Sequence, residues 1–249
     1  MAPERERVLL YAFGPSQGEL AQRIRQLGYE TLVETEPRAA AARVAHPLEP
    51  VCAILLPASL ALPQRASELD QLTRAAGTIG VRFVAVGERP AAAVQAKLRD
   101  KNVRLCLWSP FHERELRFVL NRALFDPTRG FYDVEQADVR HDLRVPTSLG
   151  ARVVVGEREK SAQVYSLAVG GCFLETLRPT LVGGALDVVL PLPLGEFRVT
   201  GRVVLTNVPG NLVRANLPRG MGIEFLRLEQ AAREAIGHYV RERAHSYEL

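Results

Sequence analysis

The pattern of apolar residues changes near residue 125, and the residues before and after this point predict different folds. Before it, short apolar runs alternate with segments whose apolar residues recur at helical spacing. After it, short strand-like runs follow one another, separated by glycine and proline. Alternating strands and helices are typical of a parallel sheet covered by helices, whereas successive short strands are typical of an antiparallel barrel or sandwich. The sequence therefore predicts an α/β domain at 1–125, a linker at 126–137 and an all-β domain at 138–249.

Five strands and five helices are expected in the first domain. The run Val51–Leu56 is continuously apolar, as expected for a strand covered on both faces of a parallel sheet. Gly28 follows an apolar helical face in Glu19–Leu27 and predicts the end of that helix. The expected strands are 8–13, 31–33, 51–56, 81–86 and 104–108, and the expected helices are 19–27, 37–45, 67–76, 91–99 and 113–125.

This order of elements resembles a response-regulator receiver domain, which has a flavodoxin-like parallel sheet. A receiver binds magnesium through an acidic pair after its first strand, but residues 11–15 here are Tyr-Ala-Phe-Gly-Pro, which offer no carboxylate ligand. Residues 56–57 are Leu-Pro where the phosphoacceptor aspartate is expected, and Gly87 stands in place of a hydroxyl residue. Ser109 replaces the lysine expected before Pro110. The resemblance therefore implies a pseudo-receiver without a metal site, which would serve as a docking or dimerisation surface.

Six short strands and a terminal helix are expected in the second domain. Glycine or proline separates the successive runs, and a small closed barrel would remove the exposed strand edges that such runs otherwise leave. The expected strands are 151–155, 162–166, 172–175, 186–190, 197–207 and 221–226, followed by a helix at 229–243.

Two arginines, Arg140 and Arg144, precede the first expected barrel strand with the spacing RxxxR. Together with the strand segments 201–205 and 220–225, this element resembles the PilZ domain family over residues 137–240. The resemblance implies an all-β barrel whose arginines clasp cyclic di-GMP. Guanidinium groups suit this nucleotide because they pair with phosphate oxygens and with the O6 and N7 atoms of guanine.

A second PilZ element, Asp or Asn, any residue, Ser, two residues and Gly, is only partly matched. Ser166 occupies the Asp or Asn position, Ala168 the Ser position and Gly171 the glycine position. The Ser166 hydroxyl can still form a hydrogen bond, but Ala168 has none to offer, and each lost bond to a desolvated ligand costs about 1 to 3 kcal/mol. Gly170 and Gly171 predict a tight turn with positive φ. The resemblance thus assigns cyclic di-GMP binding to Arg140, Arg144, Ser166, Gly170 and Gly171.

Composition and spacing exclude several other classes of protein. Lys and Arg exceed Asp and Glu by only 32 to 28, without a basic block, so nucleic acid is not expected as a partner. Cys52, Cys106 and Cys172 lack disulfide or zinc spacing, and the five histidines lack the partners of a metal site or catalytic triad. We therefore expect no metal, no cofactor and no enzymatic activity. No signal peptide and no apolar run of membrane-spanning length is found, which predicts a cytoplasmic protein without membrane contact.

Two functions remain open. The first is a bacterial effector that binds cyclic di-GMP and regulates a process such as motility through protein contacts. The second is a degenerate PilZ adaptor that does not bind the nucleotide and acts only through protein partners. In both cases a partner would use the pseudo-receiver or barrel surface, and a homodimer is one form of such contact. A DNA-binding regulator is disfavoured because the charge is even and no helix-turn-helix is found.

Overall fold

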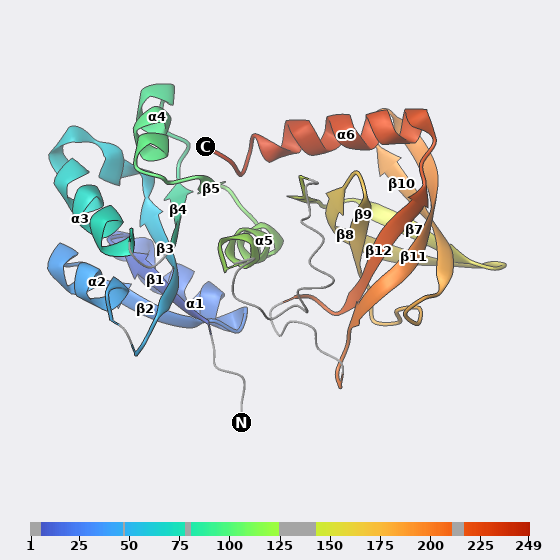
Figure 1. Cartoon of the computed structure of the whole chain (residues 1–249), viewed down its shortest axis with the longest axis horizontal. Helices are drawn as coiled ribbons and strands as arrows, with labels where there is room; N and C mark the ends of the chain where they lie inside the picture. The colour runs from blue at the N-terminus through green and yellow to red at the C-terminus, as the bar shows by residue number, and fades with distance from the viewer. Residues whose placement is uncertain (1–5, 47, 78–80, 125–142, 211–216) are drawn as a thin grey trace. The chain divides into compact units, whose positions relative to one another are not determined.

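The computed structural model describes residues 6–46, 48–77, 81–124, 143–210 and 217–249, which form two compact units (Figure 1). The first unit comprises Met1–Arg129 together with Ser246–Leu249, and the second comprises Gly130–His245. The predicted linker at 126–137 lies outside the described residues. The second domain was predicted to run to residue 249, but Ser246–Leu249 packs with the first unit.

The first unit contains a five-stranded parallel sheet with the order β2-β1-β3-β4-β5. This is the flavodoxin-like order that CheY-type receivers share, so the predicted fold is confirmed. The central strand β3 is buried along most of its length, as its continuous apolar run predicted. The strands are β1 (Arg7–Tyr11), β2 (Glu30–Glu34), β3 (Val51–Pro57), β4 (Arg82–Gly87) and β5 (Leu105–Trp108).

Helices cover both faces of this sheet (Figure 1). The face with α2, α3 and α4 encloses a core that includes Ile54, Leu72 and Leu98, while α1 and α5 cover the opposite face. Gly28 has φ +96°, so it ends the first helix in the left-handed conformation that its position predicted. The helices are α1 (Gln17–Gln26), α2 (Pro37–Val44), α3 (Ala66–Ala76), α4 (Ala92–Asp100) and α5 (Glu113–Leu124).

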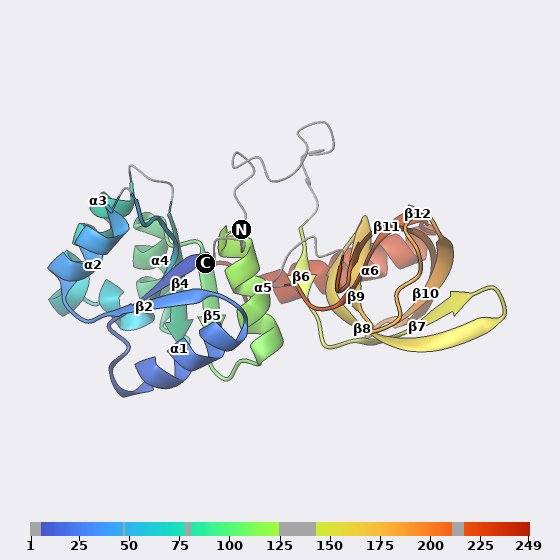
Figure 2. The ribbon, with the colours of Figure 1, turned by 90° about the horizontal axis from the view of Figure 1, so that it is seen from below.

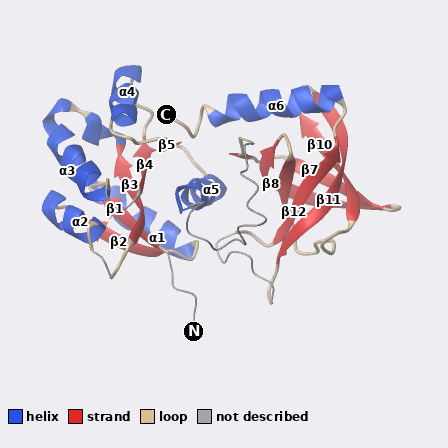
Figure 3. Cartoon of the chain, viewed as in Figure 1, coloured by secondary structure: helices blue, strands red, loops and turns tan. Residues whose placement is uncertain are grey.

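The second unit is built from strands and a single described helix (Figure 3). Six antiparallel strands close into a barrel in the order β8-β7-β10-β11-β12-β9, because β8 also pairs with β9. A seventh, two-residue strand, β6, pairs with β8 and was not predicted. The β7–β8 hairpin projects from the barrel (Figure 2). The strands are β6 (Val145–Pro146), β7 (Gly150–Val155), β8 (Arg158–Ala168), β9 (Gly171–Glu175), β10 (Ala185–Leu192), β11 (Gly195–Asn207) and β12 (Gly220–Arg227).

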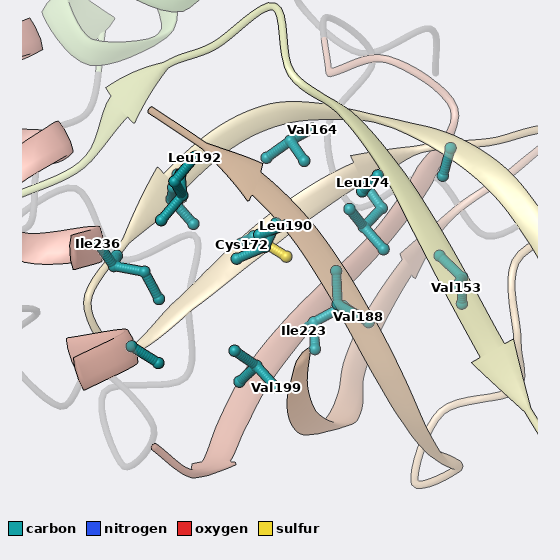
Figure 4. Packing of buried hydrophobic residues seen from close by; sticks show 14 of the residues in the cluster. Val153, Val164, Cys172, Leu174, Val188, Leu190, Leu192, Val199, Ile223 and Ile236 are labelled. Carbon is teal, nitrogen blue, oxygen red and sulfur yellow. The ribbon is translucent and has the colours of Figure 1, made fainter. Parts of the chain in front are cut away.

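The barrel encloses a continuous apolar core that α6 (Gln230–Ala244) extends (Figure 4). Alternate side chains of the strands point inward, and Ile236 of α6 joins them. Burial raises the pKa of the Cys172 thiol in this core to about 12. The predicted barrel and terminal helix are therefore confirmed. Among the described helices, none is both long and apolar enough to span a membrane.

Candidate functional site

The short strand β6 pairs with the last part of β8 and so positions the residues next to it in the sequence. Val145 pairs with Leu167 and Pro146 pairs with Ser166. Val145 is almost fully buried, and Leu143 packs against the barrel core. The Nε atom of Arg243, in the last turn of α6, donates a hydrogen bond to the carbonyl oxygen of Pro146. Arg144 therefore lies in a segment that strand pairing, burial and α6 all hold.

Arg144 and Ser166 are the two predicted site residues whose side chains the structure brings together. Arg144 Nη1 donates a hydrogen bond of 3.1 Å to Ser166 Oγ. The Ser166 side chain is only 3% exposed, so this bond satisfies a hydroxyl that would otherwise be costly to bury. Arginine carries five N–H donors in a planar fork, so one guanidinium can contact more than one acceptor. The positive charge of Arg144 also lies close enough to oppose the rise that burial causes in the pKa of Cys172.

The two glycines lie where β8 turns into β9. Val169 and Gly170 form the turn, and the Gly170 carbonyl accepts a hydrogen bond of 2.9 Å from the backbone N–H of Phe225. Gly171 does not have the positive φ that the sequence predicted; it is the first residue of β9. A Cβ atom there would lie 2.2 Å from the carbonyl oxygen of Ile223. Gly171 is thus required by the close approach of β12 and not by turn geometry.

The remaining predicted positions contribute less to the described site. Ala168 is 2% exposed and pairs with Gly171, so a methyl group occupies the place of the family's serine. Arg140 lies outside the described residues. Arg243 was missed in the sequence, because its partner is a backbone carbonyl 97 residues away and leaves no pattern in the side chains.

The first strand of the parallel sheet ends at a hydrogen-bonded group of three side chains. Tyr11 at the end of β1 donates a hydrogen bond of 2.7 Å to Glu68, which Arg65 also contacts through two N–H groups. The hydrogen bonds from Arg65 hold the pKa of Glu68 below its usual value, whereas burial raises the pKa of Tyr11. No group of three or more histidine, cysteine or acidic side chains that could hold a metal ion occurs among the described residues.

Residues 138–242 match the model of the PilZ domain family. The C-terminal unit is a PilZ domain. Among curated protein sequences, none matches the chain.

Similarity to solved structures is distributed over both units. The PilZ domain of Escherichia coli YcgR with c-di-GMP is 13% identical over 43% of this chain and 92% of that chain, with a TM-score of 0.34. Bacillus subtilis MotI/DgrA, described as an inhibitor of motility, is 19% identical over 42% of this chain and 51% of that chain, with a TM-score of 0.35. The match thus spans about half of the MotI chain. A CheY-like receiver domain protein from Methanospirillum hungatei is 15% identical over 49% of this chain and 94% of that chain, with a TM-score of 0.41.

Within the PilZ domain, the candidate site has two kinds of residues. Arg144 and Ser166, one from each of the two predicted PilZ elements, bring polar side chains together beside β8. Gly171 and Ala168 serve the packing of β8 and β9 instead. Among the described residues, the predicted positions thus bring together an arginine and a hydroxyl group, while Ala168 contributes a buried methyl group.

Proposed function

We propose that the protein is a non-enzymatic bacterial signalling protein whose PilZ domain binds cyclic di-GMP and regulates a process such as motility through protein contacts. The observation that carries this proposal is the placement of Arg144 on the β6 segment, with its guanidinium on Ser166 of the PilZ element. Fold maintenance does not require an arginine there, because Val145 and Pro146 already supply the strand pairing. In this proposal the site binds the nucleotide without a cofactor or metal ion. The protein is expected to act in the cytoplasm.

The ligand would compete with Ser166 for Arg144. A guanidinium fork makes two parallel hydrogen bonds to a phosphate or to a guanine edge, and charge-assisted bonds of this kind are about twice as strong as neutral ones. Exchange of the bond to Ser166 for a fork on the nucleotide is therefore favourable for Arg144. The hydroxyl of Ser166 would then be available to the guanine. Arg140, as the first member of the RxxxR pair, would clasp the nucleotide from the other side.

Calorimetric titration with cyclic di-GMP tests this proposal. The intact chain is expected to bind with low-micromolar or tighter affinity. An Arg144→Ala variant should weaken binding by roughly ten- to hundred-fold, since a charge-assisted bond is worth about 1.5 to 3 kcal/mol, and an Arg140→Ala, Arg144→Ala double variant should abolish it. Arg152→Ala is the matched control, because Arg152 is a half-exposed arginine of β7 that forms an ion pair with Glu196 of β11. Unchanged affinity in the double variant would refute the proposed site.

A nucleotide-independent adaptor is the second candidate function, and the buried methyl of Ala168 favours it. A serine there would add a donor to the site, so an Ala168→Ser variant separates the two candidates. For the effector, this change should tighten binding by roughly ten-fold, the equivalent of one hydrogen bond to a desolvated ligand. For the adaptor, neither the natural chain nor the variant gives binding heat. The protein partner would then contact the surface of the receiver-like unit or of the barrel, and a homodimer would be the first complex to test by light scattering.

A further inference from the structure

The loop between β9 and β10 of the PilZ domain presents apolar side chains to solvent. Its two leucines project furthest, with exposed fractions of 80% and 84%, and two valines are about half exposed. The Gly183 N–H donates a hydrogen bond of 2.8 Å to the Val203 carbonyl, which brings the loop beside β11. Single exposed leucines are ordinary, whereas apolar side chains gathered at one place indicate a contact surface. These residues form what we call the apolar patch: Leu177, Leu181 and Val182 of the loop and Val204 of β11.

Backbone hydrogen bonds fasten both ends of this loop to the barrel. The Thr176 N–H donates to the Arg219 carbonyl over 3.1 Å, and the Val203 N–H donates to the Gly184 carbonyl over 2.9 Å. Within the loop, the Gly184 N–H donates to the Leu181 carbonyl over 3.0 Å. β10 begins at the end of the barrel away from α6, so the loop that precedes it lies at that end (Figure 1). A loop that is already ordered loses little conformational entropy when its side chains make a contact.

Two exposed arginines border the apolar patch. Arg178 belongs to the loop, and the backbone of Arg219 holds the start of the loop. Among the described residues, neither arginine forms an ion pair with an acidic side chain. The loop and residues 217–223 contain no Asp or Glu, and Glu175 and Glu224, which flank these segments, each have a partner of their own. The surface is therefore apolar at its centre and positively charged at its border.

The size of the apolar patch favours a lipid surface over a protein partner. A fully exposed valine or leucine side chain offers about 60 to 120 Å² of apolar area, so these four offer roughly 160 to 320 Å² at their exposed fractions. A specific protein interface buries about 800 Å² on each partner, which is more than the patch supplies. A bilayer interface needs no matching area, because it admits single apolar groups and its negative headgroups attract nearby arginines.

We propose that the apolar patch and its two arginines dock the PilZ domain on an anionic lipid bilayer. Leu177 and Leu181 enter the boundary between headgroups and acyl chains, while Arg178 and Arg219 pair with lipid phosphates. The sequence predicted no membrane contact because no apolar run is long enough to span a bilayer, but docking at the interface needs no such run. The inference requires no nucleotide, since none of these residues belongs to the candidate site.

Flotation of the full chain with vesicles tests this proposal. Vesicles of equal parts phosphatidylglycerol and phosphatidylcholine should bind the chain at least about five-fold more strongly than vesicles of phosphatidylcholine alone, because each arginine near an anionic surface contributes about that factor. An Arg178→Gln variant should bind the anionic vesicles about five-fold more weakly and the neutral vesicles unchanged. An increase in salt from about 0.1 M to about 1 M should weaken binding to the anionic vesicles, because the screening length falls from about 10 Å to about 3 Å.

A double variant, Leu177→Ala with Leu181→Ala, tests the apolar contribution. It should lower the partition coefficient on the anionic vesicles by at least about ten-fold, because binding scales with the apolar area that enters the interface. Leu194→Ala is the matched control. Leu194 is 64% exposed but lies in the β10–β11 turn, at the other end of β10 and roughly 25 Å from the patch. This control should bind like the natural chain.

Each outcome decides for or against lipid docking. Binding to the anionic vesicles that falls in the double variant and in Arg178→Gln, but not in Leu194→Ala, supports it. Absence of vesicle binding overturns it, as does equal binding by the double variant and the control. If vesicles do not bind and light scattering shows that the double variant loses a dimer that the natural chain forms, the patch is instead a contact between copies, which also overturns the proposal. None of these results bears on the nucleotide titration, so the proposed function stands or falls separately.

Discussion

Replacement of Gly171 by alanine should destabilise the PilZ domain. The new Cβ would lie 2.2 Å from the Ile223 carbonyl oxygen and 3.4 Å from Glu224 Cα. Because ordinary contact begins near 3.4 Å, β9 and β12 must separate locally by about 1 Å. Backbone hydrogen bonds between strands do not survive such a displacement, since they need donor–acceptor distances of about 2.7 to 3.2 Å.

The expected loss follows from these contacts. Two cross-strand pairs adjoin the clash, Gly171 with Glu224 and Cys172 with Ile223. Loss of their hydrogen bonds costs about 1 kcal/mol each, and overpacking adds roughly 1 to 3 kcal/mol. The total of about 3 to 5 kcal/mol corresponds to a fall in melting temperature of roughly 12 to 40 °C for a unit of about 100 residues.

Calorimetry of the full chain measures this change. Trp108, the single tryptophan, belongs to the receiver-like unit, so its fluorescence follows the unfolding of that unit. A calorimetric transition that the fluorescence does not follow is then assigned to the barrel. The barrel transition should fall in Gly171→Ala, while the fluorescence transition should stay in place. Gly150→Ala is the matched control in the same barrel, because its Cβ would meet only Gln163 Nε2 at 3.8 Å. A barrel transition within about 2 °C of the natural chain would refute the argument from close approach.

Three further measurements follow from buried and charged groups. In a thiol titration of the folded protein, only half-buried Cys52 should react promptly, because burial raises the pKa of Cys106 and of Cys172 to about 12; rapid reaction of all three would contradict this. Hydrogen bonds from a threonine and an arginine on β11 lower the pKa of Asp187 in the folded protein. The ionised carboxylate therefore stabilises the fold at pH values above the ordinary pKa of aspartate, and this stabilisation is lost as the pH falls through the lowered pKa of the folded state. Urea unfolding should show Asp187→Asn to be less stable than the natural chain by under about 1 kcal/mol near neutral pH, with the difference vanishing in acid; a difference that persists there would oppose this cause. Burial and a carboxylate partner raise the pKa of Tyr11, so folding stability should fall as pH rises above the ordinary value of 10, and a Tyr11→Phe variant should lack that part of the alkaline loss in the same assay.

The predicted architecture succeeded where burial imposes a period on the sequence. Val51–Leu56 appears as a central strand because both faces of a parallel sheet exclude polar side chains. β6 was missed because Val145–Pro146 is too short to show any alternation. The docking of Ser246–Leu249 on β5 was missed for a related reason, since main-chain hydrogen bonds leave no pattern in side chains and Tyr247 is a single anchor.

The candidate site was predictable only in part. The spacing of Arg144 and its position before the barrel suggested a binding role, and the structure adds its bond to Ser166. For Gly171, the sequence indicated a positive φ, but the reason is the proximity of another backbone. A glycine that relieves a cross-strand clash looks the same in a sequence as one that makes a turn, because both are visible only as the absence of a side chain.

The return of the chain to its first unit has a consequence for synthesis. The receiver-like unit includes Ser246–Leu249, which the ribosome makes after the whole of the PilZ domain. The barrel can complete its hydrogen-bonded ring while β5 still lacks its outer neighbour. During that interval the nascent sheet presents an open edge, and an adjacent nascent chain on the same messenger could pair with it. The unit that is translated first is therefore the one that is finished last.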